Sequence, residues 1–512
     1  MGKKKILAIS SAVIVGVSAI AAVVAAVVFG LLPSGDGNEY LRVIPDNPVV
    51  LAKINAGSLL EKSEALENRN VQKGINMLRQ NLDGNLREAF DKIIEDPVNS
   101  GIDIRKPIFV AVTDAWNEEG LVTMAVDDVD NLKRYFELIF SEGGMSLKEQ
   151  DGVYSVIDPY GEVIWQVAFD YDKLVFAFCK NDIANAHLYV LDEKSPKAVD
   201  NAKYADIFAA EEDIVLFLNA SVFLPQIDAR IAAEEDLVTV LNGTDIRLRA
   251  DFRKGEFVLD ADVDAHEELA RVFTGLIRKG SGKHLAYVPY NAWLVANLSF
   301  DLDALEQTIS KMVNLEALMM LYGVERSMVD ALSTEYTVAM LPGEQVYGDY
   351  VPRFVLVADC TRELFDFIVE QMRMYNAIST VAADVYSIGA DYLLYKDGLL
   401  ILLPENIYKE QMTGAGLERS ILDNKEMALK DGAAAVLDIH RFLKENRMMG
   451  NAGNNGMRVV EILTRDNVGT VTLSLESLFD FTLRMNMVDS SENALKSFFD
   501  RYMEQAGIEL PE

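Results

Sequence analysis

The chain has 512 residues, of which 80 are acidic and 48 are Lys or Arg, so its formal net charge is −32. A surface this acidic repels phosphate backbones and anionic headgroups, which argues against nucleic acid as a partner and against lipid binding through a basic patch. Half of the residues are hydrophobic, which is enough for packed cores, and the length favours two to four domains.

The first 39 residues predict an N-terminal membrane anchor and linker. Lys3, Lys4 and Lys5 precede an apolar run over residues 6–32, which as a helix would be about 40 Å long, against a hydrocarbon core of roughly 30 Å. Lysines on this side hold the N-terminus in the cytoplasm. We therefore expect a single-pass helix in the inner (cytoplasmic) membrane, with the lipid bilayer as partner and the later domains periplasmic or extracytoplasmic. A cleavable signal peptide, suggested by the small residues at 19–21, is the alternative and leads to the same compartment.

An internal repeat follows the anchor. Residues 40–55 align without a gap with residues 284–299, and two later pairs keep the same order: 214–224 with 433–443, and 246–276 with 470–505. The identities in the first pair are Leu41/Leu285, Pro45/Pro289, Asn47/Asn291 and Ala52/Ala296. The repeat predicts a first domain over 40–279 and a second, homologous domain over 284–512, with the polar, glycine-bearing stretch 278–283 as a flexible linker.

Alternating apolar residues predict the first strand of each copy. Val50, Ala52 and Ile54 alternate with polar residues in the first copy, and Leu294, Ala296 and Leu298 do so in the second, so we expect one buried face on each strand. Helical patterns follow over 63–95 and 302–332, and three strand candidates lie within 152–180.

The later elements of the two copies also correspond. A strand that ends at Asn219 in the first copy and at Asp438 in the second precedes a helix that this residue can cap. Runs of adjacent strands favour antiparallel pairing. The predicted fold class is therefore α+β, with two tandem homologous domains, each a mainly antiparallel sheet covered by helices, after one N-terminal transmembrane helix.

The residues at the start of the first domain resemble a known family. The segment Tyr40–Pro45, the strand that carries Leu51, Lys53, Ile54 and Asn55, and the stretch 96–109 are similar to the domain-of-unknown-function family 4836. The resemblance covers residues 40–512 and implies an exported, envelope-attached protein of Gram-negative gut anaerobes. Members often carry a lipidated cysteine at the mature N-terminus, whereas this chain has none there. The family brings no known activity, substrate or catalytic residue.

Sequence motifs for catalysis or metal binding fail on spacing. His266 begins a zincin-like segment, but Ala270 stands where the second histidine is needed. Gly275–Lys283 resembles a phosphate-binding loop, but Ser281 occupies the position of the lysine that must follow the second glycine. His440 lies close to Asp438, which the helix cap explains better. The two cysteines, Cys179 and Cys360, each close a strand-like run and predict buried, unpaired thiols, so we expect neither a disulfide nor a cysteine-based metal site.

Other clusters also have structural explanations. Asp260, Asp262 and Asp264 alternate along a strand end and could gather for calcium, but the glycine and glutamate of a calcium loop are missing, and Asp264 reads as a helix cap. The run 127–130 predicts helix capping, the methionines near 319–328 predict core packing, and the glycine- and asparagine-rich stretch 449–456 predicts a loop. We predict no catalytic, cofactor-binding or metal-binding residue, and no cofactor.

We therefore expect a non-enzymatic binding or scaffolding protein of the cell envelope, whose partner is an unknown envelope protein or ligand. A tandem pair of domains offers a cleft between the copies for such a ligand. The alternative is a carboxylate-dependent envelope hydrolase with a site formed between the two domains. A third hypothesis is a structural spacer that holds an envelope complex at a fixed distance from the membrane.

Overall fold

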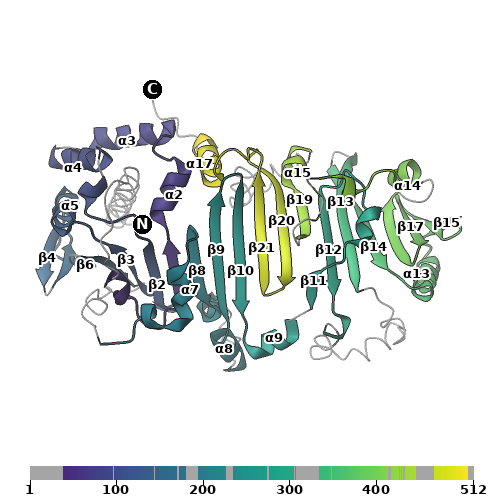
Figure 1. Cartoon of the computed structure of the whole chain (residues 1–512), viewed down its shortest axis with the longest axis horizontal. Coiled ribbons are helices and arrows are strands. Elements are labelled where there is room, and N and C mark those ends of the chain that lie inside the picture. The colour runs from purple at the N-terminus through teal and green to yellow at the C-terminus, as the bar shows by residue number, and fades with distance from the viewer. Residues whose placement is uncertain are drawn as a thin grey trace. The chain divides into compact units, whose positions relative to one another are not determined.

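The computed structural model describes residues 39–505 except for 180–193, 227–234, 307–333, 413–416, 430–432 and 446–465 and for shorter gaps of one or two residues. The described residues form two compact units (Figure 1). Unit 1 holds the described residues up to Lys254 together with those from Glu492 onward. Unit 2 holds the described residues between Gly255 and Ser491.

Unit 1 is built on antiparallel strands in the order β9-β8-β1-β2-β3-β7-β6-β5-β4 (Figure 1). Their bounds are β1 Val50–Ile54, β2 Ile108–Asp114, β3 Glu119–Ala125, β4 Ser146–Gln150, β5 Val153–Ile157, β6 Val163–Phe169, β7 Lys173–Phe178, β8 Ile214–Asn219 and β9 Asp245–Arg253. The three strands predicted within 152–180 are confirmed as β5, β6 and β7. The order places β1 between β8 and β2, so neighbours flank it on both sides.

The helices of unit 1 come from both ends of the chain. They are α2 Ala56–Ser63, α3 Arg69–Asn81, α4 Gly84–Glu95, α5 Val129–Glu142, α7 Ala205–Ala209, α8 Glu235–Asn242 and α17 Ala494–Gln505, with the 3-10 helices η1 Glu39–Val43, η2 Pro97–Ser100, η3 Ala198–Asp200, η4 Ala202–Tyr204 and η5 Ala220–Gln226. The helical pattern over 63–95 is confirmed by α3 and α4. The C-terminal helix α17, yellow in Figure 1, lies beside α2 and α3.

Unit 2 repeats the same plan. Its antiparallel strands run in the order β10-β21-β20-β19-β12-β13-β14-β18-β17-β16-β15, and a short strand β11 pairs with the end of β12. The strands are β10 Glu256–Asp264, β11 Ile277–Lys279, β12 Leu294–Phe300, β13 Glu335–Val346, β14 Asp349–Asp359, β15 Ser379–Ala382, β16 Val385–Ile388, β17 Asp391–Lys396, β18 Leu399–Pro404, β19 Ala433–Asp438, β20 Val468–Ser477 and β21 Asp480–Met487. The helices are α9 Glu267–Phe273, α13 Arg362–Met374, α14 Glu405–Gln411 and α15 Ile439–Glu445, with η6 Lys283–Tyr287 and η7 Ile421–Asp423.

The predicted fold class, in which each of two domains has a sheet of its own, is wrong. The described strands belong to a single antiparallel sheet of 21 strands. Within unit 2, β10 from the first predicted domain pairs with β21 from the second, from Glu256 opposite Asn486 to Asp262 opposite Asp480. The physical reason for this pairing is that a strand at the edge of a sheet has unpaired N–H and C=O groups, which form hydrogen bonds when another strand lies beside it.

The predicted N-terminal membrane helix is the second correction to the fold class. In the part of the chain that the structure describes, no helix combines the length and the apolar character needed to cross a membrane. The amphipathic helix α5, for example, has 14 residues and is therefore about 21 Å long. Residues 6–32, where the membrane helix was expected, lie outside the described residues, as do 319–328 and 449–456.

Three hydrogen bonds recur in the two units, and in each pair the acceptors lie at positions that the repeat aligns. Ala198 N donates to Ile44 O (3.1 Å) in unit 1, as Ile421 N does to Val288 O (2.8 Å) in unit 2. Asn219 N donates to Val49 O (2.8 Å), as Asp438 N does to Trp293 O (2.7 Å). Asn201 Nδ2 donates to Asp46 O (3.4 Å), as Asn424 Nδ2 does to Tyr290 O (3.2 Å). The shared strand order from β4 to β9 and from β15 to β20 agrees with them. The domain limits 40–279 and 284–512 stay a prediction. They were drawn from the sequence repeat, whereas the two units are defined by their compactness.

The buried face of the first strand in each copy is the opposite of the predicted one. In β1 the most deeply buried residues are Leu51 and Lys53, and in β12 they are Val295 and Asn297. Lys53 is satisfied there, because its Nζ donates to the carbonyl oxygens of Phe208 (2.8 Å) and Ala210 (2.5 Å). The opposite face of each strand is half-buried and apolar, so apolar alternation alone could not identify the inner one.

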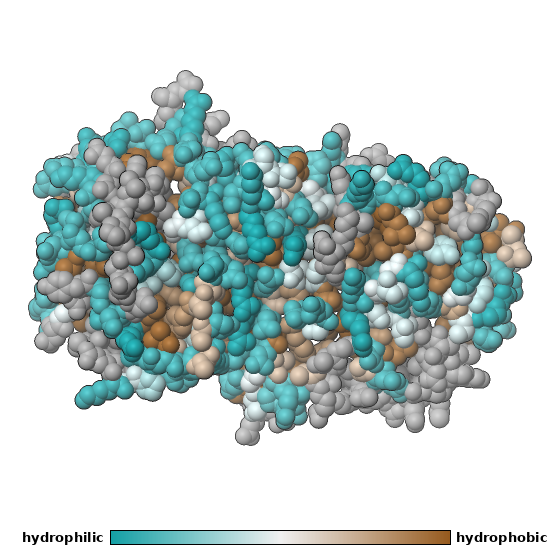
Figure 2. Space-filling model, in the orientation of Figure 1, coloured by the Kyte–Doolittle hydropathy of each residue, from teal (hydrophilic) through white to brown (hydrophobic). Residues whose placement is uncertain are grey.

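Each unit has its own hydrophobic core against its sheet. In unit 1 the largest cluster packs η1 and η4 residues, including Tyr40 and Tyr204, against strand residues such as Phe109 and Phe217. In unit 2 the corresponding cluster includes Val295 of the central strand β12. On the face drawn in Figure 2, hydrophilic residues predominate and hydrophobic ones form separate patches, as expected for a chain of net charge −32.

Candidate functional site

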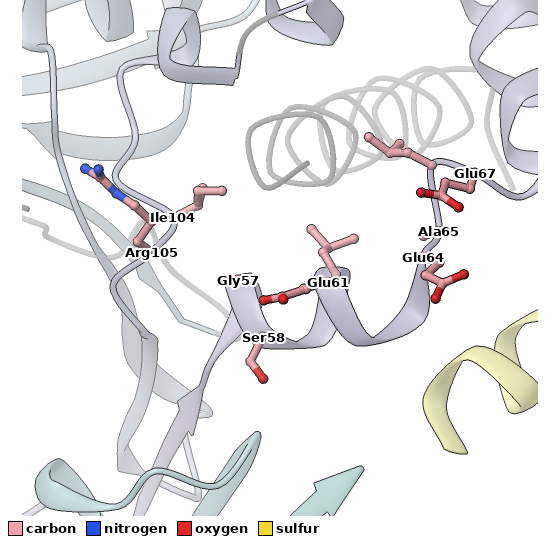
Figure 3. A pocket seen from close by; sticks show the side chains of 10 residues that line it. Gly57, Ser58, Glu61, Glu64, Ala65, Glu67, Ile104 and Arg105 are labelled. Carbon is pink, nitrogen blue, oxygen red and sulfur yellow. The ribbon is translucent and has the colours of Figure 1, made fainter. Parts of the chain in front are cut away.

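A cavity of about 650 Å³ lies in unit 1 beside helix α2. Figure 3 shows α2 and the turn after it on one side, and the loop with Ile104 and Arg105 across from them. The lining residues are Gly57, Ser58, Leu60, Glu61, Glu64, Ala65, Leu66, Glu67, Ile104 and Arg105. The volume is within the range of cavities that hold small molecules.

The inner side of α2 is fixed by a buried carboxylate. Asp213 is fully buried, and it accepts hydrogen bonds from Ser58 Oγ (2.6 Å), Lys62 Nζ (2.7 Å) and the backbone N–H of Phe252 (2.7 Å). Lys62 also donates to Asp251 Oδ1 (2.8 Å). The Ser58 hydroxyl points away from the cavity in Figure 3. These contacts make α2 a rigid wall whose polar anchor faces the sheet.

The same contacts shift the pKa values of the charged groups behind α2. Burial by itself would lower the pKa of Lys62, but hydrogen bonds to Asp213 and Asp251 raise it above its ordinary value. Burial would raise the pKa of Asp251, but hydrogen bonds from Lys62 and Arg253 lower it to about 2. Both groups are therefore charged near neutral pH and are held as ion pairs.

The outer side of the cavity carries exposed carboxylates. Glu61, Glu64 and Glu67 recur every three residues along α2 and the turn after it, and all three are exposed. Glu64 Oε2 lies 3.9 Å from Nζ of Lys496 in α17. The guanidinium of Arg105 points away from α2 in Figure 3 and pairs with Asp103 (2.8 Å). The rim formed by α2 and the turn after it is therefore acidic.

The interior of the cavity is partly apolar. Leu66 and Ile104 are buried, and Leu60 is half-buried and packs against Ile104 in a small cluster. An acidic rim over an apolar wall suits a ligand that has a polar or positively charged part and an apolar part. The arrangement serves recognition, since the exposed carboxylates of the rim remain solvated.

A second polar cluster is buried in unit 2. Asn297 Nδ2 donates to Glu335 Oε1 (2.9 Å) and to Thr337 Oγ1 (2.6 Å), and Ser281 Oγ donates to Glu335 Oε2 (2.7 Å). Burial would raise the pKa of Glu335, but these donors and backbone N–H groups lower it. The stretch 278–283, which we predicted to be a flexible linker, is thus fixed to the sheet of unit 2.

His284 and Asp359 form an adjacent pair in unit 2. The fully buried His284 places Nε2 3.2 Å from Asp359 Oδ1, and Lys283 Nζ lies 2.6 Å from Asp359 Oδ2. Burial would raise the pKa of Asp359, but hydrogen bonds from Lys283 and His284 lower it. These contacts attach η6 to the end of β14. Sequence reasoning missed the pair because its members are 75 residues apart.

Residues that the sequence analysis assigned to helix caps largely occupy them. Asp438 Oδ1 accepts from Arg441 N (2.9 Å), and Asp128 Oδ1 accepts from Asn131 N (2.9 Å). At α9 the cap is His266, whose Nδ1 accepts from Glu268 N (3.3 Å), and not Asp264 as predicted.

The aspartates considered for calcium do not gather in one site. Asp260 accepts a hydrogen bond from Thr482 of β21 (2.5 Å). Within the described ranges, no group of three or more His, Cys, Asp or Glu side chains is placed to hold a metal ion. Cys179 and Cys360 are free thiols; Cys360 is buried, which raises its pKa to about 11, whereas Cys179 is only half-buried.

The sequence model of one protein family, described as a domain of unknown function (DUF4836), matches residues 40–340, which is more than half of the chain. The chain belongs to this family. The match to DUF4836 includes all the residues that line the cavity and also the pair Asn297 and Glu335. No curated protein and no solved structure matches the chain. Membership in DUF4836 assigns no activity, so function must be argued from the geometry.

Proposed function

We propose that this chain is a non-enzymatic binding protein that acts outside the cytosol and takes its ligand in the cavity beside α2. The cavity itself carries the proposal: a volume of about 650 Å³ with a partly apolar interior and an acidic rim, on a helix fixed from behind by Asp213. A rigid wall favours binding, because little conformational entropy is lost when the ligand enters.

The state of the carboxylates supports binding over acid–base catalysis. A catalytic acid or base usually sits in a desolvated cleft that shifts its pKa toward neutrality. Glu61, Glu64 and Glu67 are exposed at the rim. The carboxylate of Asp251, which has a strongly shifted pKa, lies in the ion pairs behind α2, and its pKa is shifted away from neutrality.

The extracytoplasmic location is supported by the first residues of the sequence. Lys3, Lys4 and Lys5 before an apolar run are typical of export signals, whether or not the run is later removed. Protease treatment of spheroplasts tests this location. We expect the chain to be degraded while a cytosolic marker survives; protection of both until lysis would contradict export.

Matched charge variants test the cavity. The variant Glu61→Gln/Glu64→Gln/Glu67→Gln removes three negative charges from the rim. The control Glu363→Gln/Glu370→Gln/Glu410→Gln removes three exposed charges from α13 and α14 of unit 2. Each full-length protein is purified from the envelope, and bound molecules are identified by native mass spectrometry.

We expect a ligand that copurifies with the wild type and the control but is reduced at least tenfold in the rim variant, which corresponds to a loss of about 1.4 kcal/mol. Equal retention by all three proteins, or no bound molecule in any of them, would show that the cavity is not a ligand site.

A further inference from the structure

Two aromatic side chains project into solvent from turns of unit 1. Trp116 is 58% exposed in the turn between β2 and β3, and Tyr160 is 73% exposed in the turn between β5 and β6. Large aromatic side chains usually gain free energy by burial, and Trp and Tyr are the residues most enriched at the centres of binding surfaces. A single exposed ring needs no special explanation, but two rings close enough to contact one ligand form a candidate binding surface.

The strand register places both turns at the same end of the sheet. Gly120, at the start of β3, lies opposite Phe178 at the end of β7, and Val167 of β6 lies opposite Phe176. The end of β7 is therefore level with the starts of β3 and β6. Cys179 Sγ, just after β7, lies 3.7 Å from the carbonyl oxygen of Asn117. With strands about 4.8 Å apart, the two turns are roughly 10–15 Å from each other.

Each aromatic residue is held by an aspartate two positions before it. Asp114 Oδ1 accepts from the backbone N–H of Trp116 (2.8 Å) and of Asn117 (3.1 Å). Asp158 Oδ1 accepts in the same way from Tyr160 N (2.8 Å) and Glu162 N (2.9 Å). Asx turns of this kind fix the backbone. The rings are thus presented on rigid turns, which reduces the entropy cost of binding.

The surroundings of the rings indicate the chemistry of the ligand. Exposed Asn117 and Glu118 follow Trp116, and exposed Glu162 follows Tyr160. The core of a protein–protein interface is apolar and depleted of charged residues, whereas here each ring stands among amide and carboxylate groups. A sugar ring matches this pattern, because its C–H face stacks on an aromatic ring and its hydroxyl groups bond to amides and carboxylates at the edge.

We propose that this end of unit 1 binds an extended, uncharged polysaccharide, with Trp116 and Tyr160 each stacked on a different sugar ring of the same chain. The separation of the turns requires several linked sugars. The net charge of −32 disfavours an anionic polysaccharide. Unit 2 has Gly389 and Ala390 in its matching turn between β16 and β17, so the surface belongs to unit 1.

Affinity electrophoresis of the full-length chain tests the proposal. Native gels contain hydroxyethyl cellulose, xyloglucan, galactomannan or pullulan, with carboxymethyl cellulose as the anionic counterpart of the first. We expect at least one neutral polysaccharide to retard the wild type and carboxymethyl cellulose not to do so. Trp116→Ala and Tyr160→Ala should each weaken binding roughly tenfold, and the double variant should migrate as in a gel without polysaccharide.

Tyr375→Ala is the matched control, because Tyr375 is 79% exposed on unit 2, and it should be retarded like the wild type. Tryptophan emission should shift when the retarding polysaccharide is added to the wild type, and not when it is added to Trp116→Ala. Two results would overturn the proposal: no retardation of the wild type by any neutral polysaccharide, or unchanged retardation of the Trp116 and Tyr160 variants. Unchanged circular dichroism spectra will show that the variants fold.

Discussion

At the scale of single residues, the position of α2 depends on the carboxylate of Asp213. Its oxygens accept three hydrogen bonds, and one of the donors is the ammonium of Lys62, whose side chain is only 28% exposed. Charged pairs of this kind add little net stability compared with an apolar core, but the loss of one partner leaves the other uncompensated. The cavity wall is therefore sensitive to this one side chain.

Asp213→Ala should destabilise unit 1 by about 3 kcal/mol, since Lys62, Ser58 and the N–H of Phe252 all lose their acceptor. Native-state hydrogen exchange of the α2 and β9 amides measures the effect. Asp200→Ala is the control: its pair with Arg42 is exposed on both sides, so a change below about 1 kcal/mol is expected. Similar losses in the two variants would contradict the role given to Asp213.

The acid stability of unit 1 follows from Asp251. Its folded-state pKa, about 2, lies below the value of about 3.9 in an unfolded chain. The stabilisation is thus fully present above about pH 4 and is lost as the pH falls toward 2. Asp251→Asn should cost about 1–2 kcal/mol at pH 7, discounted for partial exposure, and should flatten the pH dependence of α2 exchange between pH 4 and pH 2. An unchanged pH profile would refute this assignment.

Single residues also show where local sequence patterns stop being informative. The alternation around Val50 predicted a strand correctly, but it indicated the wrong inner face, because Lys53 and Asn297 are buried polar residues. Their partners are remote: Lys53 donates to carbonyl groups more than 150 residues away. A buried lysine is compatible with a core only when such partners are known, and a local pattern does not contain them.

At the scale of elements, the stretch 280–282 shows how a glycine-rich segment can be mistaken for a linker. Gly282 N donates to Asn297 Oδ1 and to Glu335 Oε1, both at 3.1 Å. A Cβ at Gly280 would overlap Asn297 Oδ1 and lie 2.8 Å from Glu335 Oε1. Glycine is needed here for close approach to the buried cluster and not for flexibility.

Gly280→Ala should therefore destabilise unit 2 by about 1–3 kcal/mol, because Asn297 and Glu335 must move from a satisfied arrangement. Gly74→Ala is the matched control in helix α3 of unit 1. A Cβ there meets no atom within 4 Å, so a gain of about 0.5–1 kcal/mol is expected from helix propensity. Hydrogen exchange of β12 and of α3 measures both changes. A neutral Gly280→Ala would show that the stretch is a flexible connection.

Elements with strong local signals were predictable, whereas the candidate site was not. The caps at Asp128 and Asp438 follow from residue type and position. The cavity joins α2 to the loop that carries Ile104 and Arg105, and no periodicity shows that these segments face each other. Glu61, Glu64 and Glu67 do share a three-residue spacing, which was the one signal that could have indicated the rim.

At the scale of the whole molecule, unit 1 is built from two segments of the chain, one before unit 2 and one after it. Helix α17 follows the last strand of unit 2 but belongs to unit 1. Its Asp500 accepts from Asn68 Nδ2 (2.5 Å), and the preceding Asn493 donates from Nδ2 to the carbonyl oxygen of Phe252 (2.9 Å). Unit 1, with its cavity, is therefore completed only when the C-terminus has been made.

Removal of residues 492–512 should thus loosen unit 1 and leave unit 2 intact, although the deleted residues follow unit 2 in the sequence. Without α17, helix α2 and strand β9 lose a packing neighbour and the carbonyl oxygen of Phe252 loses its donor, so their amides should exchange at least tenfold faster. The amides of β13 and β14 should exchange as in the full-length chain, because α17 packs against α2, α3 and β9 of unit 1. Faster exchange confined to β13 and β14, with α2 unchanged, would mean that the C-terminal helix stabilises unit 2 and that the cavity does not depend on it.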